Sequence, residues 1–377
     1  PGWLTAAVPA AYTFGPLLLI VLLSQFTPLY HVRYLFSYAP AFYVILAAGL
    51  AGLASRFRPW TALATAGLLL AGSFFSIYHY HFNPRYRPDD FRAAVRFIQA
   101  HWQPGDVIMT NAGYLYTAVD YYADLPGLAR RRLVPYPTPT PPGRPLGLEA
   151  GAVNGDPQLG WGDPQSDFYA MSETETRVAL EHMSADFARL WLLRGYDTVT
   201  DPGGLIRDWL AGQAVPLEDQ VFSGESQIRV QGYILDGAPQ PAAAATPVEF
   251  EDGLVLAAWD LPQQAWSPGQ ALYLRLWWLA AAPPHADYKM SLKLWNANGD
   301  LAAQGRDEWP VGVLYRATAW PLDRPVYHPT ALTLPPALPP GQYWLNVELY
   351  HPATVQALPR LDGQDPVVTL GPVTVVK

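Results

Sequence analysis

The stretch "YLFSYAPAFYVILAAGLAGLASRFRPWTALATAGLLLAGSFFSIYHYHF" (residues 34–82) decides the class of fold, because it holds two long runs without a charged residue. Each run reaches the roughly 20 residues that a helix needs to cross the hydrocarbon core of a bilayer. A third run without a charged residue, residues 3–26, precedes them, and we therefore predict three membrane-spanning helices, at about residues 3–26, 34–54 and 60–80. Three core helices of a soluble protein are the alternative, and three such runs so close together disfavour it. Aromatic side chains stand near the ends of the runs, as at membrane interfaces: Trp3, Tyr30, Tyr34, Trp60, Tyr78 and Tyr80.

Charged residues are distributed unevenly along the 377 residues. No aspartate or glutamate precedes Asp89, and the charged residues before Pro84 are Arg33, Arg56 and Arg58. The formal net charge is −8, so the acidic excess belongs to the later part and argues against a nucleic-acid partner there. There is no cysteine, which excludes disulfides and thiolate metal sites.

The short loop "SRFRP" predicts the orientation of the membrane part, which covers residues 1–82. Its two arginines, Arg56 and Arg58, favour the cytoplasmic side. We therefore expect a multi-pass protein of the cell membrane whose carboxyl-terminal domains are extracytoplasmic. Arg85 and Arg87, which follow the third run, weaken this preference.

Helical and strand patterns alternate over residues 83–235, which predicts a small α/β domain. "DDFRAAVRFIQAHWQPGDVIMTN" (89–111) contains an amphipathic helix followed by a buried strand, and "SETE" (172–175) has the spacing of a capping box. "DPGGLIRDWLAG" predicts a helix that Asp201 caps. Residues 135–170 are rich in proline and glycine, and we expect a surface insertion there.

A second soluble domain is predicted at the carboxyl end. "DGAPQPAAAATP" (236–247) has the composition of a linker. Residues 248–377 contain strands and turns alone, spaced as in an antiparallel β-sandwich.

Several polar residues are candidates for chemistry, each with a simpler interpretation beside it. His79 and His81 could share one face of a strand as metal ligands, but an interfacial role is favoured because no third ligand is evident. Asn111 ends the predicted strand "VIMT" and Gly113 opens the next helix. Ligands of α/β domains often bind at such strand ends, although a plain turn is the favoured interpretation.

The predicted sandwich offers two further candidates. Asp307 and Glu308 are adjacent, so they face opposite sides of a strand, unlike the paired carboxylates of a glycoside hydrolase. We expect a solvated turn there. Trp277 and Trp278 also point to opposite faces, so at least one belongs to the core, and a sugar-binding aromatic face is the less favoured interpretation.

Arg33 lies near the start of the second run, with His31 and Tyr34 beside it. A charged side chain at this depth is costly unless it faces headgroups, a cavity or an anion. Arg33 could bind a lipid phosphate through charge-assisted hydrogen bonds. It could equally extend to the interface as a simple anchor, and the residues alone do not separate the two interpretations.

"HVRYLFSYAPAFYVILAAGLAGL" (31–53) resembles the "RYL-x-x-x-x-P" segment that occurs late in bacterial GT-C type integral-membrane glycosyltransferases. These are related to protein mannosyltransferases and aminoarabinose transferases. "DFRAAVRFIQAHWQPGDVIMTN" (90–111) resembles their segment after the last span. "LYLRLWW", "DYKMSLKLWNANGDLAAQ" and "LPPGQYWLNVELY" resemble a sandwich that is appended to large members.

This resemblance implies transfer of a sugar from a polyprenyl-phosphate carrier to an acceptor on the outer side of the membrane. Arg33 would contact the carrier phosphate, with His31 and Tyr34 as further substrate-binding candidates. Family catalysis relies on acidic residues in the first extracytoplasmic loop, and the membrane part of this chain has no carboxylate. The sequence starts at Pro1 without methionine, so we expect a fragment whose general base lies upstream and which is inactive alone.

No catalytic residue, metal site or cofactor is predicted. The expected partners are the lipid bilayer, a polyprenyl-phosphate-linked sugar and a cell-surface glycan or protein. A membrane-anchored surface protein, whose sandwich binds a glycan or a protein without catalysis, is the alternative. A transporter fragment ranks last, because the apolar runs offer few polar residues to line a path.

Overall fold

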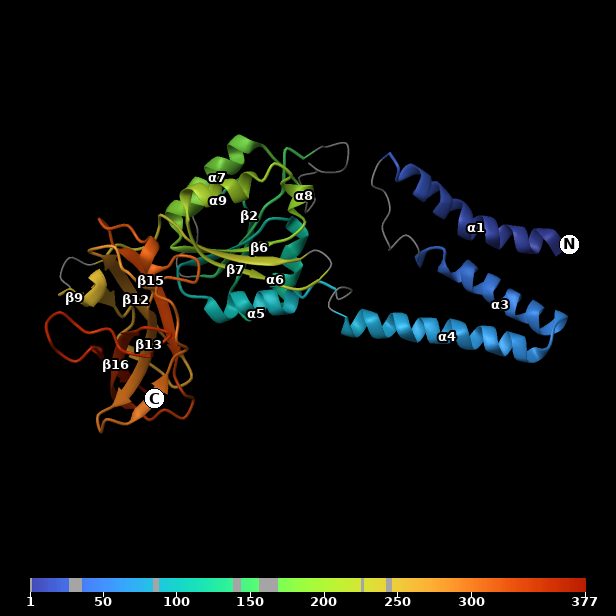
Figure 1. Ribbon diagram of the computed structural model, residues 1–377. Coiled ribbons are helices and arrows are strands. Elements are labelled where there is room, and N and C mark those ends of the chain that lie inside the picture. The colour runs from blue at the N-terminus through green and yellow to red at the C-terminus, as the bar shows by residue number, and fades with distance from the viewer. Residues whose placement is uncertain are drawn as a thin grey trace. The chain divides into compact units, whose positions relative to one another are not determined.

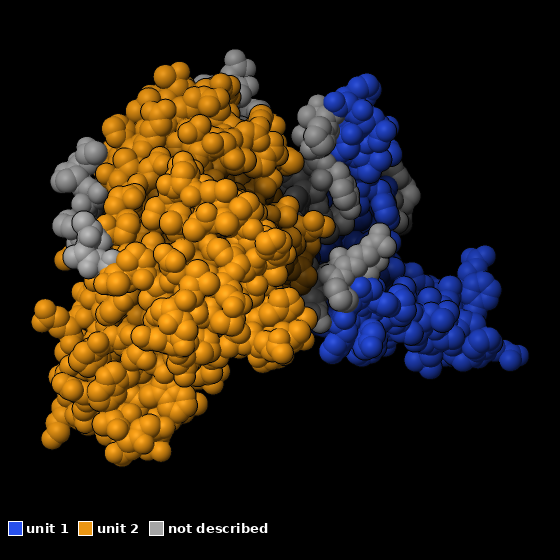
Figure 2. Space-filling view, turned by 60° about the vertical axis from the view of Figure 1, so that its left-hand side comes forward, with its two compact units in different colours: residues 1–87 blue, residues 88–377 orange. Residues whose placement is uncertain are grey.

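The computed structural model describes residues 2–26, 36–83, 88–137, 144–155, 169–224, 227–241 and 246–377, with the side chains of residues 2–6 and 113 left out. The chain forms two compact units, residues 1–87 and residues 88–377 (Figure 2).

The first unit is helical. It contains α1 (Gly2–Leu23), α3 (Ala39–Arg56) and α4 (Pro59–Phe82), with α3 packed beside both α1 and α4 (Figure 1). Prolines stand in the first turns of α3 and α4, where the missing N–H would have no helical partner. Tyr12 of α1 donates a hydrogen bond to the carbonyl of Ser37 at 3.3 Å, and its ring meets that of Tyr38 edge to face.

Two of the three predicted spans have the length and composition of a membrane helix, namely α3 and α4. Neither contains a buried residue, and side chains such as Leu68 and Phe74 are 75% and 69% exposed. Apolar surface of this extent suggests a membrane anchor. The first predicted span, at about residues 3–26, is not confirmed, because the part of α1 with described side chains, Ala7–Leu23, is shorter than a span.

The second unit begins with a six-stranded sheet in the order β2-β3-β1-β6-β8-β7. The first four strands of this order are parallel, and β8 and β7 form an antiparallel hairpin at the edge. The strands are β1 (Asp106–Thr110), β2 (Ala129–Arg132), β3 (Leu146–Glu149), β6 (Arg189–Arg194), β7 (Val215–Val221) and β8 (Arg229–Ile234). The short strands β4 (Ala152–Val153) and β5 (Ala170–Met171) pair separately.

Helices cover both faces of this sheet (Figure 1). Side chains of α5 (Phe91–His101) and α6 (Tyr116–Tyr122) pack on one face against Ile108 and Trp191. Side chains of α7 (Glu173–Asp186) and α9 (Leu205–Gln213) pack on the other against Met109 and Leu192. Alternate residues of β1 and β6 thus serve opposite layers, and the predicted α/β domain is present.

Local signals set the ends of these helices. Asp90 accepts from the backbone N–H of Ala93 at 2.9 Å, and Ser172 with Glu175 forms the predicted capping box. The N-cap of α9 is Gly204 and not Asp201. Asp201 nevertheless accepts from the first two N–H groups of the helix, so its carboxylate provides the predicted cap from one turn away.

The predicted insertion at 135–170 is partly wrong. Within it, β3 lies between β2 and β1, and its side chains Leu146 and Leu148 are 2% and 1% exposed. Four residues between proline and glycine turns are too short for an alternating pattern, which is why the sequence does not reveal this strand. Residues 138–143 and 156–168 lie outside the described residues.

The carboxyl-terminal part is the predicted β-sandwich, with sheets in the orders β15-β12-β10-β9 and β11-β17-β16-β13-β14. All pairs are antiparallel except β11 with β17. The strands are β9 (Val248–Glu249), β10 (Leu254–Asp260), β11 (Ala265–Trp266), β12 (Ala271–Ala280), β13 (Lys289–Asn296), β14 (Leu301–Gln304), β15 (Val326–Thr333), β16 (Gly341–Tyr350) and β17 (Val368–Val375).

The sandwich and the α/β domain share a core. Leu217 and Ile234 of the edge hairpin join the buried cluster of the sandwich, and the backbone N–H of Leu314 donates to the Leu217 carbonyl at 3.1 Å. Trp277 of β12 donates through its ring N–H to the carbonyl of Pro239 at 2.9 Å. The predicted linker therefore begins as a packed segment, although residues 242–245 lie outside the described residues.

A buried ion pair joins the two central strands at their amino ends. Asp106 and Arg189, the first residues of β1 and β6, meet through two hydrogen bonds of 2.9 and 2.7 Å. Asp106 also accepts from the ring N–H of Trp191 and the backbone N–H of Gln103. Burial by itself lowers the pKa of Arg189, but the Asp106 carboxylate outweighs this effect and raises it.

We expect Asp106→Asn to destabilise the second unit by about 3–5 kcal/mol, because it leaves the Arg189 guanidinium buried without a counter-charge. Chemical denaturation followed by tryptophan fluorescence measures the change. The matched control is Asp208→Asn, which breaks a solvent-exposed ion pair with Arg207 and should leave the midpoint unchanged. Equal midpoints for the two variants would contradict this role for Asp106.

Candidate functional site

The substrate-binding residues predicted for the membrane part, His31, Arg33 and Tyr34, lie outside the described residues, so their role stays a prediction. His79 and His81 are on helix α4 and not on a strand. Residues two apart lie about 200° apart around a helix, so these imidazoles point to different sides. Within the described ranges no group of three histidine, aspartate or glutamate side chains could hold a metal ion.

Asn111 is structural, as its simpler interpretation predicts. Its Oδ1 accepts from the backbone N–H of Gly195 at 2.8 Å, and its carbonyl accepts from Thr200 Oγ1 at 3.0 Å. The side chain is buried at the carboxyl ends of β1 and β6. Asn111 therefore fixes the loop that follows β6.

The acidic pair of the sandwich is not a solvated turn, which corrects that expectation. The backbone of Glu308 bridges to Met290 and so prolongs the sheet beyond β14. Asp307 accepts from Tyr350 Oη at 2.7 Å, whereas Glu308 accepts from Thr330. The sequence missed this pairing because the partners are distant in the chain.

Trp277 and Trp278 are both core residues, 4% and 0% exposed. The ring N–H of Trp278 donates to His328 Nδ1 at 3.1 Å, and Trp277 packs near Tyr327. Neither ring can serve as a sugar platform.

The segments that follow β1 and β6 lead to opposite faces of the sheet. After β1 the chain passes through η2 (Gly113–Leu115) into α6 on one face of the sheet. After β6 it passes through α8 (Asp197–Thr200) into α9 on the opposite face. In open α/β sheets, ligands bind in the crevice that forms at such a switch in direction.

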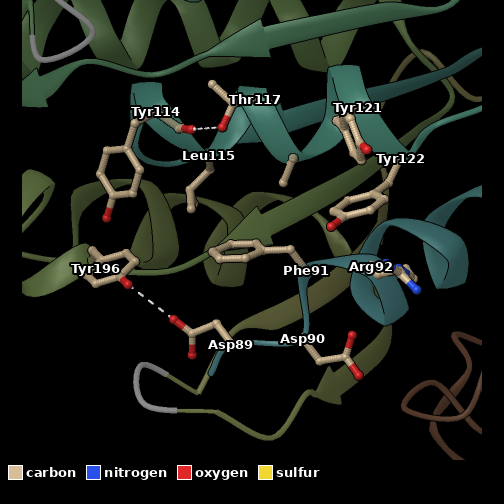
Figure 3. A pocket seen from close by; sticks show the side chains of 11 residues that line it. Asp89, Asp90, Phe91, Arg92, Tyr114, Leu115, Thr117, Tyr121, Tyr122 and Tyr196 are labelled. Carbon is tan, nitrogen blue, oxygen red and sulfur yellow. Dashed lines mark hydrogen bonds between the residues drawn. The ribbon is translucent and has the colours of Figure 1, made fainter. Parts of the chain in front are cut away.

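A pocket of about 630 Å³ lies at this edge (Figure 3). The amino end of α5, the turn η2, helix α6 and the loop after β6 surround it. Its lining is rich in tyrosine and includes two aspartates: Asp89, Asp90, Phe91, Arg92, Tyr114, Leu115, Thr117, Ala118, Tyr121, Tyr122 and Tyr196. This volume falls within the range of small-molecule sites.

Tyr196 has an unusual backbone, with φ at +56° in the left-handed region. A non-glycine residue there is strained, and such strain is often found at functional sites. The loop is held by the Asn111 hydrogen bond to Gly195 and by the ion pair between Arg194 and Asp197. The sheet thereby presents the Tyr196 ring toward the pocket (Figure 3).

Hydrogen bonds and ring contacts order one wall of the pocket. Tyr196 Oη donates to Asp89 Oδ2 at 3.1 Å, and the rings of Tyr114 and Tyr196 meet with centroids 5.2 Å apart (Figure 3). Burial raises the pKa of Tyr114, and Tyr196 and the Asp89 carboxylate raise it further. The Tyr114 phenol is therefore protonated and remains a hydrogen-bond donor across the neutral pH range.

The opposite wall is more exposed. The Tyr121 side chain is 80% exposed, and the Arg92 guanidinium lies 5.5 Å from the centre of the Tyr122 ring. The described lining contains two aspartates and one arginine, so the pocket is acidic. Aromatic faces, carboxylates and phenols suit a ligand with many hydroxyl groups, whereas the charge disfavours a phosphate.

The sequence alone did not single out these residues. The tyrosine-rich stretch "YLYTAVDYY" (114–122) contributes Tyr114, Tyr121 and Tyr122 to the lining. That signal was available. Tyr196 and Asp89 belong to segments far apart in the sequence, and only the sheet topology brings them together.

No family model matches the chain, and no curated protein matches it. Solved structures show low-level similarity. The C-terminal domain of wzt has 8% identity and a TM-score of 0.26, covering 37% of this chain and 83% of its own. The CARDB domain of a Pyrococcus furiosus protein has 13% sequence identity and a TM-score of 0.20, and the match covers 36% of this chain and 100% of that domain. A Niemann-Pick type C2 protein from the Japanese carpenter ant has 10% sequence identity and a TM-score of 0.21, and the match covers 36% of this chain and 96% of that protein. Scores this low support no argument about function.

We expect Asn111→Ala to destabilise the second unit by about 1–3 kcal/mol, because the Gly195 N–H would lose its acceptor in a buried position. Urea unfolding measures this cost. Asn298→Ala, on an exposed turn of the sandwich, is the control and should be neutral. An Asn111→Ala protein as stable as the control would show that the loop does not depend on this side chain.

Proposed function

We propose that this chain is the carboxyl-terminal part of a GT-C type membrane glycosyltransferase, and that its α/β domain binds a saccharide in the tyrosine-lined pocket. The observation that carries the proposal is the acidic, aromatic pocket at the carboxyl edge of the sheet. The apolar helices and the sequence resemblance support the membrane assignment.

The chemistry of the lining supports a saccharide. Aromatic rings pack against the C–H faces of a sugar ring, and a carboxylate can accept hydrogen bonds from two neighbouring hydroxyls. Tyr114 and Tyr121 supply rings on both sides, and Asp89 and Asp90 supply acceptors. Specific small-molecule sites place a few polar groups among aromatic surfaces.

The carrier phosphate is assigned to the membrane part, since the acidic pocket repels it. Arg33, with His31 and Tyr34, is the proposed phosphate contact. Asp89 follows the last predicted span, which ends near Tyr80, by nine residues. We place the second unit outside the cell on the basis of Arg56 and Arg58.

The reaction requires a general base that deprotonates the acceptor hydroxyl. The described part of the membrane unit contains no carboxylate, and the pocket aspartates are engaged with Tyr196 and with a backbone N–H of α5. The proposed division is that this chain binds and orients substrate, and that an acidic loop upstream in the whole protein performs the chemistry.

A membrane-anchored glycan-binding protein without catalysis is the second candidate. The pocket favours it in one respect, because its lining combines aromatic rings with hydrogen-bonding groups, as binding sites do. A transfer assay on the complete reading frame separates the two candidates.

The pocket predicts saccharide binding that depends on Tyr121. We expect saturation-transfer NMR to detect at least one of the methyl glycosides of glucose, galactose, mannose and N-acetylglucosamine on the full chain. The detergent must have no sugar headgroup. Tyr121→Ala should weaken binding about tenfold, which corresponds to about 1.4 kcal/mol, because the most exposed ring of the wall is lost.

Val178→Ala, an exposed substitution on α7 at the other face of the sheet, is the control and should bind as the unaltered chain does. Inorganic phosphate should not compete with the glycoside. Failure of all four glycosides to bind would contradict the pocket assignment.

Arg33→Ala in the complete protein is expected to abolish sugar transfer from the polyprenyl-phosphate donor while leaving membrane insertion intact. The physical reason is the loss of a charge-assisted contact to phosphate. Arg56→Ala, in the loop between the second and third predicted spans, is the matched control and should retain transfer. Normal activity of Arg33→Ala would remove this arginine from the site.

A further inference from the structure

The carboxylates of the tyrosine-lined pocket outnumber its cations, and this imbalance points to the charge of the ligand. Asp89 and Asp90 belong to the described lining, against the single guanidinium of Arg92. That guanidinium lies over the Tyr122 ring, 5.5 Å from its centre. A ligand that enters the pocket therefore meets an excess of negative charge.

Asp90 can be reached by such a ligand, because its side chain is exposed at the border of the pocket (Figure 3). Its Oδ1 atom accepts from the backbone N–H of Ala93 at 2.9 Å. A backbone N–H is a neutral donor, so this contact leaves the charge of the carboxylate unneutralised. A cationic group of a ligand would supply the missing counter-charge.

The tyrosine rings of the lining form two edge-to-face pairs. The ring centres of Tyr121 and Tyr122 lie 4.8 Å apart with an angle of 89° between their planes, and those of Tyr114 and Tyr196 lie 5.2 Å apart at 60°. Rings that meet at such angles form corners, and their faces attract a compact cation. The position of Arg92 over Tyr122 shows that one of these rings already accepts a cation.

The amino end of α5 does not make the pocket an anion site. The backbone N–H of Phe91 donates to the Asp89 carbonyl at 3.0 Å, and that of Ala93 donates to Asp90. These donors of the first turn are therefore not offered to a phosphate or a carboxylate. The raised pKa of Tyr114, to which the Asp89 carboxylate contributes, is a second sign of negative potential in the pocket.

We propose that the pocket binds a ligand with a cationic ammonium group, for which Asp90 is the counter-charge and the tyrosine rings are the surrounding faces. The inference rests on the saccharide proposed for the same pocket, and it narrows that saccharide to an amino sugar. An ammonium group has three N–H donors and no acceptor, which matches a carboxylate. A neutral sugar would leave the Asp90 charge without a partner.

The test compares methyl glucosaminide, methyl glucoside and choline by saturation-transfer NMR titration of the full chain. The detergent has no sugar headgroup, and the buffer is at about pH 6, where the amine is protonated. We expect methyl glucosaminide to bind about tenfold more tightly than methyl glucoside, which corresponds to about 1.4 kcal/mol. Added salt should reduce this ratio, because the pocket is open to solvent.

Two variants that each remove one negative charge test the role of Asp90. Asp90→Asn should bring the ratio of the two affinities to about one, since the amide keeps an acceptor without the charge. Asparagine caps a helix as well as aspartate does, so α5 should remain intact. Glu181→Gln, at an exposed position of α7 on the other face of the sheet, is the matched control and should keep the tenfold ratio.

The outcomes separate this inference from the proposed function. Equal affinity for the two glycosides, or an unchanged ratio in folded Asp90→Asn, would overturn the ammonium site and leave a saccharide pocket. Failure of both glycosides to bind would overturn the saccharide as well. Binding of choline without methyl glucosaminide would overturn the amino sugar and identify a lipid headgroup as the source of the ammonium.

Discussion

The buried ion pair between Asp106 and Arg189 is the constraint on which the second unit depends. It fixes the first residues of β1 and β6 beside each other, so these parallel strands pair in one register to their carboxyl ends. There Asn111 holds the Gly195 backbone, and Tyr196 is turned toward the pocket. Because removing one partner of a buried pair leaves the other charge uncompensated, the arrangement is strongly specified. The ion pair at the amino ends of β1 and β6 thus helps to fix the pocket, which lies at the carboxyl ends of the same two strands.

The sandwich is bound into this framework and is not a free appendage. Leu217 and Ile234 of the edge hairpin enter its core, and Trp277 holds the carbonyl of Pro239. One compact unit, residues 88–377, therefore contains both the α/β domain with its pocket and the sandwich.

The pocket combines tyrosine rings with carboxylates. Within it the Tyr196 hydroxyl lies beside the Asp89 carboxylate, and the carboxylates disfavour a phosphate. In the first unit, α3 and α4 have the length and composition of membrane helices.

Local sequence was sufficient to predict the apolar runs of α3 and α4, the capping box at Ser172, and the alternation of the sandwich strands. These features depend on residues close together in the chain, whose periodicity follows from helix and strand geometry. Three others emerged only from the folded chain: β3 lies inside the sheet, Tyr196 meets Asp89, and Trp295 pairs with Trp344. Each of these joins segments distant in sequence. Local pattern carries no information on such register, because burial and pairing are settled only when the whole core assembles.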